Sequence, residues 1–375
     1  MSHRLTSLLH QSIRENYDLR LKSAAPIGTG AMSTTLKLVT NRGVLFLKIY
    51  KSAADQRTKA GLEPQRIAFT HTVQNFLHQS GFPVPRLLPN RKGETSSRTG
   101  RRETQQIYAL SEFIEGHDYD VGNLDQLRAA GQMLALFHQQ LRGFQAQRQP
   151  ALQLCSESPT MDGCSDFSES EEFGQSGSTD TEVFSQLTDR LSHLRSAVEN
   201  SKSAPVSQSQ IGRWADEVEE LRVNCQSGNV DDSCSSEWII HGDYRAQNLK
   251  FDGGRVHAVL DLDTVCPANR LYDLGYALVF FPSVYQNIPL TVDQQSIFLH
   301  AYESIYPLSE ANRRMLATHI RVAFLRGMTL WLDLYYFGGM SKRTRPWIQG
   351  YLHHIDRIFA CDTKSLDKVR YKPPG

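Results

Sequence analysis

The stretch His241-Gly-Asp-Tyr-Arg-Ala-Gln-Asn248 decides how this sequence is interpreted. It places a carboxylate, Asp243, five residues before a carboxamide, Asn248, and a second carboxylate, Asp261, follows the apolar run after it. Phosphoryl transfer from ATP needs one group that orients the attacking hydroxyl and two oxygen ligands for Mg2+. The ordered set therefore indicates this chemistry, whereas an isolated His-x-Asp would be equally typical of an acidic loop in an ordinary α/β protein.

Two further patterns follow the first. The apolar stretch from Asn248 to Leu260 turns at Asp252-Gly-Gly254, which predicts a β-hairpin. Val259-Leu-Asp-Leu-Asp263 comes next, and Tyr272-Asp-Leu-Gly275 lies shortly beyond it. Together these motifs resemble those of the aminoglycoside phosphotransferase and choline kinase superfamily, over roughly residues 20–360 and most specifically in this catalytic core.

The resemblance implies a role for each matching residue. Asp243 corresponds to the catalytic base, and Asn248 and Asp261 correspond to the magnesium ligands. Asp263 is an auxiliary metal carboxylate at most, because many relatives carry another residue there. Asp273 is expected to accept hydrogen bonds from the backbone of the catalytic loop.

Three basic side chains near this core have two interpretations each. Arg245 stands two residues after the base, where an arginine could neutralise the moving phosphoryl group, or it could form a salt bridge to a neighbouring carboxylate. His241 is expected to pack beneath the loop and not to shuttle protons. His138, at the end of an amphipathic helix predicted over 123–141, is expected to be a packed or capping histidine and not a ligand.

The N-terminal third predicts a small β-rich lobe. A strand over 19–24 precedes a glycine-containing turn over 27–33, and Asn41-Arg-Gly43 predicts a hairpin between two further strands. Glycine turns let backbone N–H groups approach phosphates. By resemblance Gly28, Gly30 and Ser33 contact the nucleotide, and Lys48 on the following strand contacts its α- and β-phosphates. The alternative for Lys48 is a lysine that reaches solvent from an edge strand.

One departure from the family concerns the partner of Lys48. The family pairs this lysine with a glutamate on the next helix, and the expected position falls at residues 70–72, where the sequence has Thr-His-Thr. Glu63 is the nearest acid, and Pro64 after it marks a helix start. Either Glu63 reaches Lys48 or another acid replaces it, Asp261 being the candidate.

The segment after the small lobe resembles an interlobe hinge. Backbone groups near Ser111 and Phe113 are expected to pair with the adenine edge, as the resemblance implies. The basic stretch over 86–102 has no aromatic residue, so it predicts a solvated loop and not an RNA-binding patch.

The expected fold class is α+β, with a two-lobed protein-kinase-like fold. Residues 1–110 form a small β-rich, nucleotide-binding lobe, 111–116 a hinge, and 117–375 a larger, mostly helical lobe. Residues 148–181 are rich in serine and acids, which predicts a disordered acidic insert. Helices are expected over 184–198, 211–223 and much of 294–359.

Composition agrees with an intracellular enzyme. The 41 basic and 40 acidic residues nearly cancel, so no nucleic-acid partner is expected. The N-terminus lacks the apolar core of a signal peptide, and no uncharged apolar run is long enough for a membrane span. The six cysteines form no zinc-like set. The expected location is the cytoplasm, and the expected cofactors are ATP and Mg2+.

The acceptor is expected to be a small molecule with a hydroxyl group: an amino alcohol, an amino acid, an aminoglycoside or another sugar. The aromatic C-terminal region with Asp333 would suit a cationic acceptor, but such a stripe is more often core. An alternative function is a catalytically weak nucleotide-binding regulator, which the missing helix glutamate favours and the intact Asp243, Asn248 and Asp261 oppose. A protein kinase ranks last, because only twelve residues separate Asp261 from Asp273.

Overall fold

The computed structural model describes residues 7–29, 33–51, 64–99, 106–147, 180–201, 204–227, 238–282 and 289–355. The chain forms two compact units. The first contains the described residues up to Gly116 and the segment Ala258–Thr264, and the second contains the other described residues. Most of the predicted acidic insert over 148–181 lies outside the described residues.

An antiparallel sheet is the centre of the first unit. Its strands run in the order β1-β2-β3-β6-β4, and β5 also pairs with β6. Their bounds are β1 Leu21–Thr29, β2 Ser33–Thr40, β3 Gly43–Tyr50, β4 Leu87–Leu88, β5 Ser97–Thr99 and β6 Gln106–Glu112. Pairing of Thr40 with Gly43 confirms the predicted hairpin. The prediction that β1 gives way to a turn at Ile27 is wrong, because a register shift beside Gly28 lets the strand continue to Thr29.

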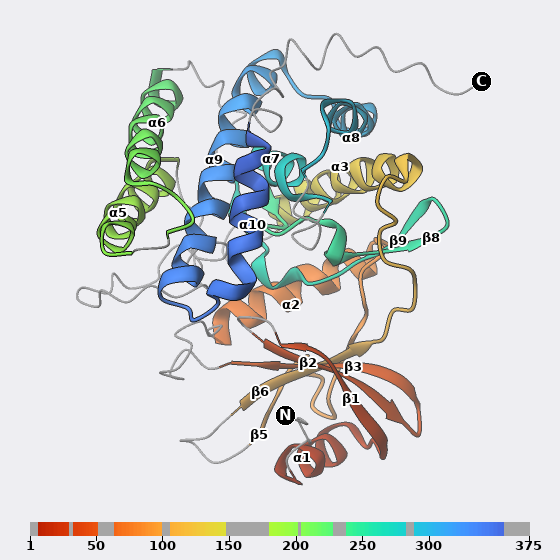
Figure 1. Ribbon diagram of the computed structural model, residues 1–375. Coiled ribbons are helices and arrows are strands. Elements are labelled where there is room, and N and C mark those ends of the chain that lie inside the picture. The colour runs from red at the N-terminus through yellow and green to blue at the C-terminus, as the bar shows by residue number, and fades with distance from the viewer. Residues whose placement is uncertain are drawn as a thin grey trace. The chain divides into compact units, whose positions relative to one another are not determined.

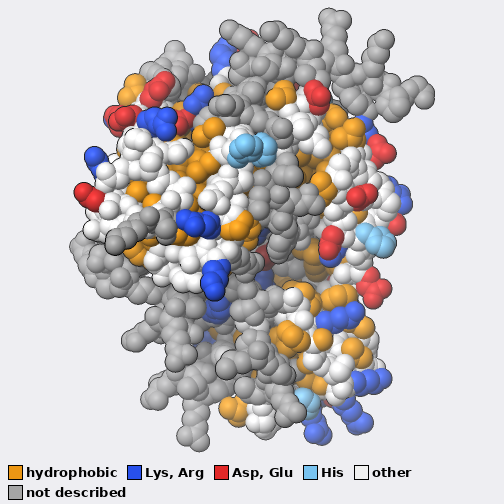
Figure 2. Space-filling model, viewed as in Figure 1, with side chains coloured by type: hydrophobic (Ala, Val, Ile, Leu, Met, Phe, Trp, Pro, Cys, Tyr) orange, Lys and Arg blue, Asp and Glu red, His pale blue; other side chains and the backbone are white. Residues whose placement is uncertain are grey.

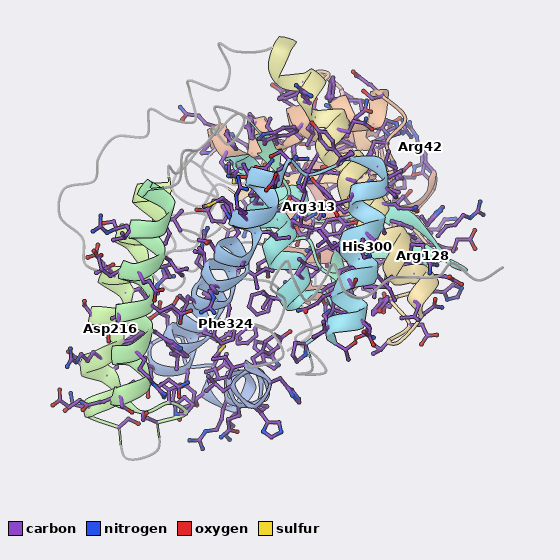
Figure 3. All side chains as sticks on the ribbon, turned by 90° about the horizontal axis from the view of Figure 1, so that it is seen from above. Arg42, Arg128, Asp216, His300, Arg313 and Phe324 are labelled. Carbon is purple, nitrogen blue, oxygen red and sulfur yellow. The ribbon has the colours of Figure 1, made fainter. Side chains whose placement is uncertain are left out.

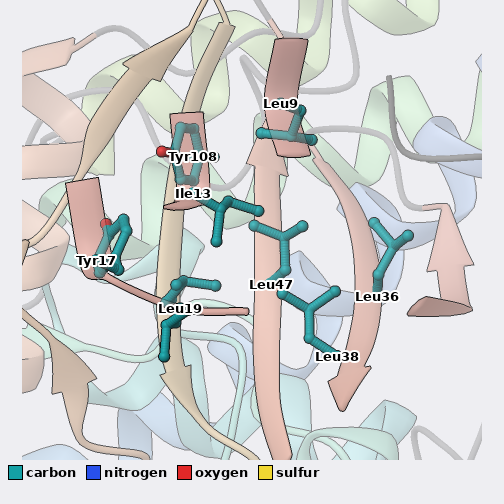
Figure 4. Packing of buried hydrophobic residues seen from close by; sticks show 9 residues of the cluster. Leu9, Ile13, Tyr17, Leu19, Leu36, Leu38, Leu47 and Tyr108 are labelled. Carbon is teal, nitrogen blue, oxygen red and sulfur yellow. The ribbon is translucent and has the colours of Figure 1, made fainter. Parts of the chain in front are cut away.

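One face of this sheet is covered by the N-terminal helix α1 (Ser7–Tyr17). Leu9, Ile13 and Tyr17 of α1 pack in one buried cluster with side chains from three strands, as Figure 4 shows. The strand members of that cluster are Leu36, Leu38, Leu47, Tyr108 and Leu110. The amphipathic N-terminus is therefore part of the core of the first unit.

The opposite face of the sheet carries helix α2 (Pro64–Gln79). Side chains alternate between the two faces of a strand. Tyr50 of β3 and Ala109 of β6 accordingly point away from the α1 cluster and pack with Ile67 of α2. Lys48, two residues before Tyr50 on β3, lies on this same face.

Helices dominate the second unit (Figure 1). Their bounds are α3 Leu124–Gln147, α5 Asp180–Glu199, α6 Gln208–Ser227, α7 Arg270–Phe280, α8 Val292–Ile305, α9 Glu310–Tyr336 and α10 Ser341–His353. Two small strand pairs accompany them: β7 (Trp238–Ile240) with β10 (Cys266–Ala268), and β8 (Leu249–Asp252) with β9 (Arg255–Val259). The β8–β9 pair confirms the hairpin predicted from Asp252-Gly-Gly254.

Helix α9 is the element on which other helices of this unit assemble. Helices α5, α6, α7 and α10 all contact it. Phe324 of α9 lies on the side toward α6, where it meets Trp214 edge-on at 6.2 Å between ring centroids, while Asp216 lies on the outer side of α6 (Figure 3). The long helix predicted through Val322 is thus a buried packing element.

The described surface carries both signs of charge. Figure 2 shows lysine, arginine and acidic side chains on the described part of one face, in keeping with a formal net charge of +1. Among the helices that the structure describes, none is long and apolar enough to cross a membrane.

Candidate active site

The Asp243 carboxylate accepts three side-chain contacts. The Tyr276 hydroxyl donates to Oδ1 at 2.7 Å, and the Asn248 amide Nδ2 donates to Oδ2 at 2.9 Å. Arg245 places a guanidinium nitrogen 3.0 Å from the same Oδ2. The Asp243 side chain is 15 % exposed, so it is largely, but not completely, removed from solvent.

Asp273 fixes the loop that carries Asp243. Its buried carboxylate accepts the backbone N–H of His241 at 2.6 Å and of Gly242 at 2.7 Å. Gly242 has φ +80°, a conformation that side-chain-bearing residues rarely adopt, and this lets two successive N–H groups face one carboxylate. The predicted role of Asp273 is confirmed.

The two histidines of this region are packed, as predicted. His138 contacts Asp273 Oδ2 through Nε2 at 3.1 Å and the Tyr302 hydroxyl through Nδ1 at 2.9 Å. Burial lowers the pKa of His138, against the opposing effect of Asp273. His241 is fully buried and its ring lies against Phe137. Neither ring therefore faces a substrate.

Asn248 uses its amide nitrogen on Asp243. Nδ2 donates to the Asp243 backbone carbonyl at 2.8 Å as well as to the carboxylate. Because both amide hydrogens are used this way, the carboxamide oxygen is turned away from Asp243. The residue ends the 3-10 turn Ala246–Asn248 and leads directly into β8. An oxygen held in this manner has the chemistry of a magnesium ligand.

A second group of charged side chains lies in the first unit. Lys48 Nζ is 2.7 Å from Asp261 Oδ1 and 2.6 Å from Asp263 Oδ2. The Lys48 side chain is 13 % exposed, that of Asp263 5 % and that of Asp261 50 %. Burial alone lowers the pKa of Lys48, but the charges of Asp261 and Asp263 outweigh it and raise that pKa, so the ammonium stays charged.

The expected partnership between Lys48 and Asp261 is confirmed, and Asp263 joins it. Both aspartates belong to the segment Ala258–Thr264, which the first unit holds through a hydrogen bond from Val259 N–H to the Pro83 carbonyl at 2.8 Å. Glu63, the other candidate partner, lies outside the described residues.

His71 is the middle residue of the stretch 70–72, where the family resemblance predicts a glutamate. Its ring nitrogens bond the Tyr50 hydroxyl at 2.9 Å and the Thr95 hydroxyl at 2.8 Å. Burial, and then the charge of Lys48, lower the pKa of His71 to about 4. A neutral imidazole supplies one donor and one acceptor, which suits two hydroxyl partners.

The other predicted nucleotide contacts have different settings. Gly28 pairs with Thr35 inside β1, Ser33 begins β2, and Gly30 lies outside the described residues. Ser111 is buried in β6 between Phe46 and Leu87 of the flanking strands. Phe113 follows that strand, and Lys37 lies over its ring at 4.3 Å. Their contacts with a nucleotide stay predictions.

The aromatic C-terminal helices are tightly packed. Trp331 of α9, Tyr351 of α10 and Phe280 of α7 contact one another with ring centroids 5.1–5.4 Å apart. Asp333, considered above as a counter-ion for a cationic acceptor, lies 2.7 Å from Arg190, and both are only 12 % exposed. Burial raises the pKa of Asp333 to about 6. These contacts favour the core interpretation for Asp333.

Besides the Lys48–Asp263 pair, two further contacts to the predicted site residues were not anticipated from sequence. Tyr276 follows Asp273 by three residues on α7, and residues at that spacing share a helix face, so the spacing itself was an available signal. Arg66 of α2 donates to the backbone carbonyl of Asp263 at 3.3 Å. This second contact joins residues 197 positions apart, so no local sequence pattern could predict it.

Comparisons with known proteins find relatives among small-molecule kinases. A homoserine kinase from Zymomonas mobilis subsp. mobilis is 20 % identical over 328 residues, which is 86 % of this chain and 85 % of that protein. Among solved structures, an amicoumacin kinase in complex with AMP-PNP, Ca2+ and Ami has a TM-score of 0.64 at 12 % identity, covering 97 % of each chain. An aminoglycoside phosphotransferase from Alicyclobacillus acidocaldarius has a TM-score of 0.60 at 13 % identity, covering 98 % of each.

These likenesses show that the α+β fold is the kinase-like fold of small-molecule phosphotransferases, as the resemblance predicted. The model of the phosphotransferase enzyme family matches residues 23–308. That span contains the Asp243 loop with Asp273 and Tyr276, and also Lys48 with its two aspartates. The chain therefore belongs to the phosphotransferase enzyme family.

Proposed function

We propose that this protein transfers the γ-phosphate of ATP to a hydroxyl group of a small acceptor, with Asp243 as the residue that receives the hydroxyl. The supporting observation is the Asp243 carboxylate itself, held by Tyr276, Asn248 and Arg245 on a loop that Asp273 fixes. An orienting carboxylate and a carboxamide five residues later are the parts that phosphoryl transfer requires.

Counting acceptor positions shows how Asp243 can work. A carboxylate offers about four lone-pair positions, and three donors already occupy Asp243. The remaining position can accept a hydrogen bond from the acceptor hydroxyl. Asp243 would hold that oxygen in line with the γ-phosphorus. It would take the hydroxyl proton as the new P–O bond forms and the bond from the γ-phosphorus to the departing ADP oxygen breaks. Because the transition state is loose, most of the acceleration would come from this positioning and not from basicity.

Two cationic side chains would handle the phosphate charge. Lys48, kept charged by its aspartates, would contact the α- and β-phosphates of the nucleotide. Arg245 contacts Asp243 through a guanidinium group that presents several donors in a fixed plane. It would turn from the carboxylate to the transferred phosphoryl group as negative charge moves there.

The residues present fit a magnesium ion chemically. The Asn248 carboxamide oxygen and the half-exposed Asp261 carboxylate are hard oxygen donors, and neither is a soft ligand that would favour zinc. Asn248 and Asp261 would hold this ion, whose chemistry there would be to neutralise phosphate charge. Within the described residues no group of three or more His, Cys, Asp or Glu side chains is arranged around a single ion.

Homoserine is the acceptor to test first. The homoserine kinase of Zymomonas mobilis aligns over most of both chains, and a homoserine kinase of Neisseria meningitidis serogroup B is 31 % identical over 88 residues. Amino alcohols, aminoglycosides and other sugars complete the panel. Asp333 is paired with Arg190, so this carboxylate gives no support to a cationic acceptor.

The decisive variant is Asp243→Asn, which keeps the size of the side chain and removes its charge. We expect turnover on the preferred acceptor to fall by about 10²-fold or more, as for loss of a positioned general base, while the affinity for an ATP analogue stays nearly unchanged. Asp252→Asn is a matched control, because that carboxylate is 72 % exposed on the β8–β9 turn. Equal turnover of Asp243→Asn and wild type would refute the role of Asp243.

A further inference from the structure

Asp263 occupies an unusual position between two cations. Its carboxylate lies 2.6 Å from Lys48 of β3, and its backbone carbonyl accepts a hydrogen bond from Arg66 of α2 at 3.3 Å. The residue is only 4 % exposed. Burial of a carboxylate costs free energy unless charged partners compensate for the lost solvation. Lys48 and Arg66 provide such partners for Asp263.

The two aspartates that contact Lys48 are unequal. Asp261 has a side chain that is 50 % exposed, whereas that of Asp263 is 5 % exposed. A metal ion that keeps several waters needs an accessible ligand, and Asp261 satisfies this condition. The buried Asp263 is suited to a permanent contact within the protein.

Helix α2 supplies no acid to this site along its described length. Its sequence, PQRIAFTHTVQNFLHQ, contains neither aspartate nor glutamate. It contributes the cationic Arg66 and, one turn further on, His71, which burial keeps neutral at physiological pH. In this part of the structure, the helix therefore approaches the Lys48 site with a positive group.

We propose that Asp263 is the permanent anchor of Lys48, oriented by Arg66, and that it takes the place of a helix carboxylate. This proposal rests on the proposed function, in which Lys48 binds nucleotide phosphate and Asp261 binds Mg2+. Asp263 is then a positioning residue and not a metal ligand.

The two-aspartate arrangement solves a conflict. If Asp261 alone held Lys48, recruitment of Asp261 by a magnesium nucleotide would leave the largely buried ammonium without a protein partner. With Asp263 in place, Lys48 exchanges Asp261 for phosphate oxygens while one carboxylate keeps its Nζ oriented. The hydrogen bond from Arg66 to the backbone carbonyl would help to keep Asp263 beside Lys48.

Binding of a non-hydrolysable ATP analogue, measured by calorimetry with Mg2+ and with EDTA, separates the two aspartates. We expect Asp263→Asn to weaken binding by about tenfold under both conditions, because Lys48 loses its orientation. We expect Asp261→Asn to abolish mainly the gain that Mg2+ confers. Asparagine is chosen because Asp261 has φ +57°, which asparagine tolerates better than alanine. Asp18→Asn, at an exposed ion pair of the same unit, is the control.

A double-mutant cycle protects the test against simple misfolding. If Asp263 acts through Lys48, then Lys48→Met and Lys48→Met/Asp263→Asn should bind the analogue equally weakly. Their melting temperatures, measured without nucleotide, should also be non-additive. Additive losses in melting temperature would overturn the proposal that Asp263 anchors Lys48. The proposal would also be overturned if Asp263→Asn lowered the apparent Mg2+ affinity but left binding of the analogue in EDTA unchanged.

The cycle also separates this proposal from the proposed function. Melting temperatures report the Lys48–Asp263 contact in the full chain whether or not phosphate is transferred. Wild-type protein that transfers no phosphate to any acceptor would refute the proposed function, yet a non-additive melting cycle would still support the anchor. Arg66→Gln provides an additional variant, for which we expect a smaller loss of nucleotide affinity in the same direction as Asp263→Asn.

Discussion

Single hydrogen bonds decide how the Asp243 carboxylate is aimed. Oδ1 is held by Tyr276, and Oδ2 by Asn248 and Arg245. The Tyr276 side chain is partly buried. Burial, followed by the charge of Asp243, raises the pKa of its hydroxyl, so the hydroxyl remains a donor. Rotation of the carboxylate is thereby restricted from both sides.

Tyr276→Phe tests this restriction, because it removes only the hydroxyl oxygen that donates to Asp243. A hydrogen bond to a charged acceptor contributes about 1.5–3 kcal/mol, so we expect kcat to fall by roughly 10-fold or more. The KM for ATP should stay unchanged, because Tyr276 belongs to the Asp243 group and not to the Lys48 group. Tyr17→Phe, which removes a hydroxyl bonded to Ser97, controls for loss of a buried tyrosine oxygen. An unchanged kcat would mean that Tyr276 only fills space.

His71 gives the fold a defined pH dependence. Its pKa is lowered to about 4 in the folded protein, below the value of about 6.5 in an unfolded chain. The unfolded state therefore binds more protons between these values, and this contribution to stability is complete above pH of about 6.5 and lost as pH falls toward about 4. The full effect amounts to about 3 kcal/mol.

Urea unfolding at several pH values measures this contribution. We expect the unfolding free energy of His71→Gln to depend less steeply on pH between about 4 and 6.5 than that of wild type. The difference between the unfolding free energies of the two proteins cancels the contributions of the other titrating groups, including Asp333. The exposed His257→Gln should follow the wild-type slope. Parallel curves for His71→Gln and wild type would show that His71 is not buried in its neutral form.

At the scale of elements, a glycine allows helix α7 to pack closely against helix α9. A Cβ built on Gly275 would lie 2.8 Å from the His319 backbone oxygen of α9, closer than real contacts allow. Helices α7 and α9 therefore approach through this position. Because α7 carries both Asp273 and Tyr276, its distance from α9 also sets where those two side chains meet the Asp243 loop.

Gly275→Ala should push the two helices apart. Alanine gains about 1 kcal/mol of helix propensity over glycine, but overpacking against backbone costs about 1–3 kcal/mol, and we expect the net effect to be destabilising. Gly212→Ala in α6 is the matched control, because a Cβ there meets nothing within 4 Å, and it should stabilise the protein. Thermal unfolding of both variants decides the matter, since equal stabilisation would mean that α7 and α9 are not in close contact.

Elements were easier to predict than their partners. The hairpin at Asp252-Gly-Gly254 and the helix through Leu124 follow from turn residues and apolar periodicity, and both are present. The length of β1 was not predictable. Glycine in a sequence favours a turn, whereas in the structure a register shift beside Gly28 keeps this glycine within the strand. That α1 forms core with the sheet was equally hidden, since amphipathicity does not name the surface that a helix covers.

At the scale of the whole molecule, the sequence predicted contacts within short spans and missed those across long ones. Asp243 and Asn248 belong to one loop, so their spacing indicated that they lie close together, and a hydrogen bond joins their side chains. Lys48 and Asp261 are 213 positions apart, and only family resemblance brought them together in advance. Arg66 and Asp263 follow no family pattern quoted above, and the contact between them emerges from how the first unit folds.

The left-handed backbone of Asp261 has a consequence for which sequences this position can accept. At φ +57° only glycine, asparagine and aspartate are well tolerated, so folding alone would admit three residues there. In the proposed function, glycine would supply no oxygen ligand there and asparagine no negative charge, so activity would select the carboxylate. Position 261 can be randomised and the library sorted once for folded protein and once for activity. The residues recovered for activity should then be a subset of the residues recovered for folding. The difference between those sets would be the part of the sequence constraint that chemistry imposes and architecture does not.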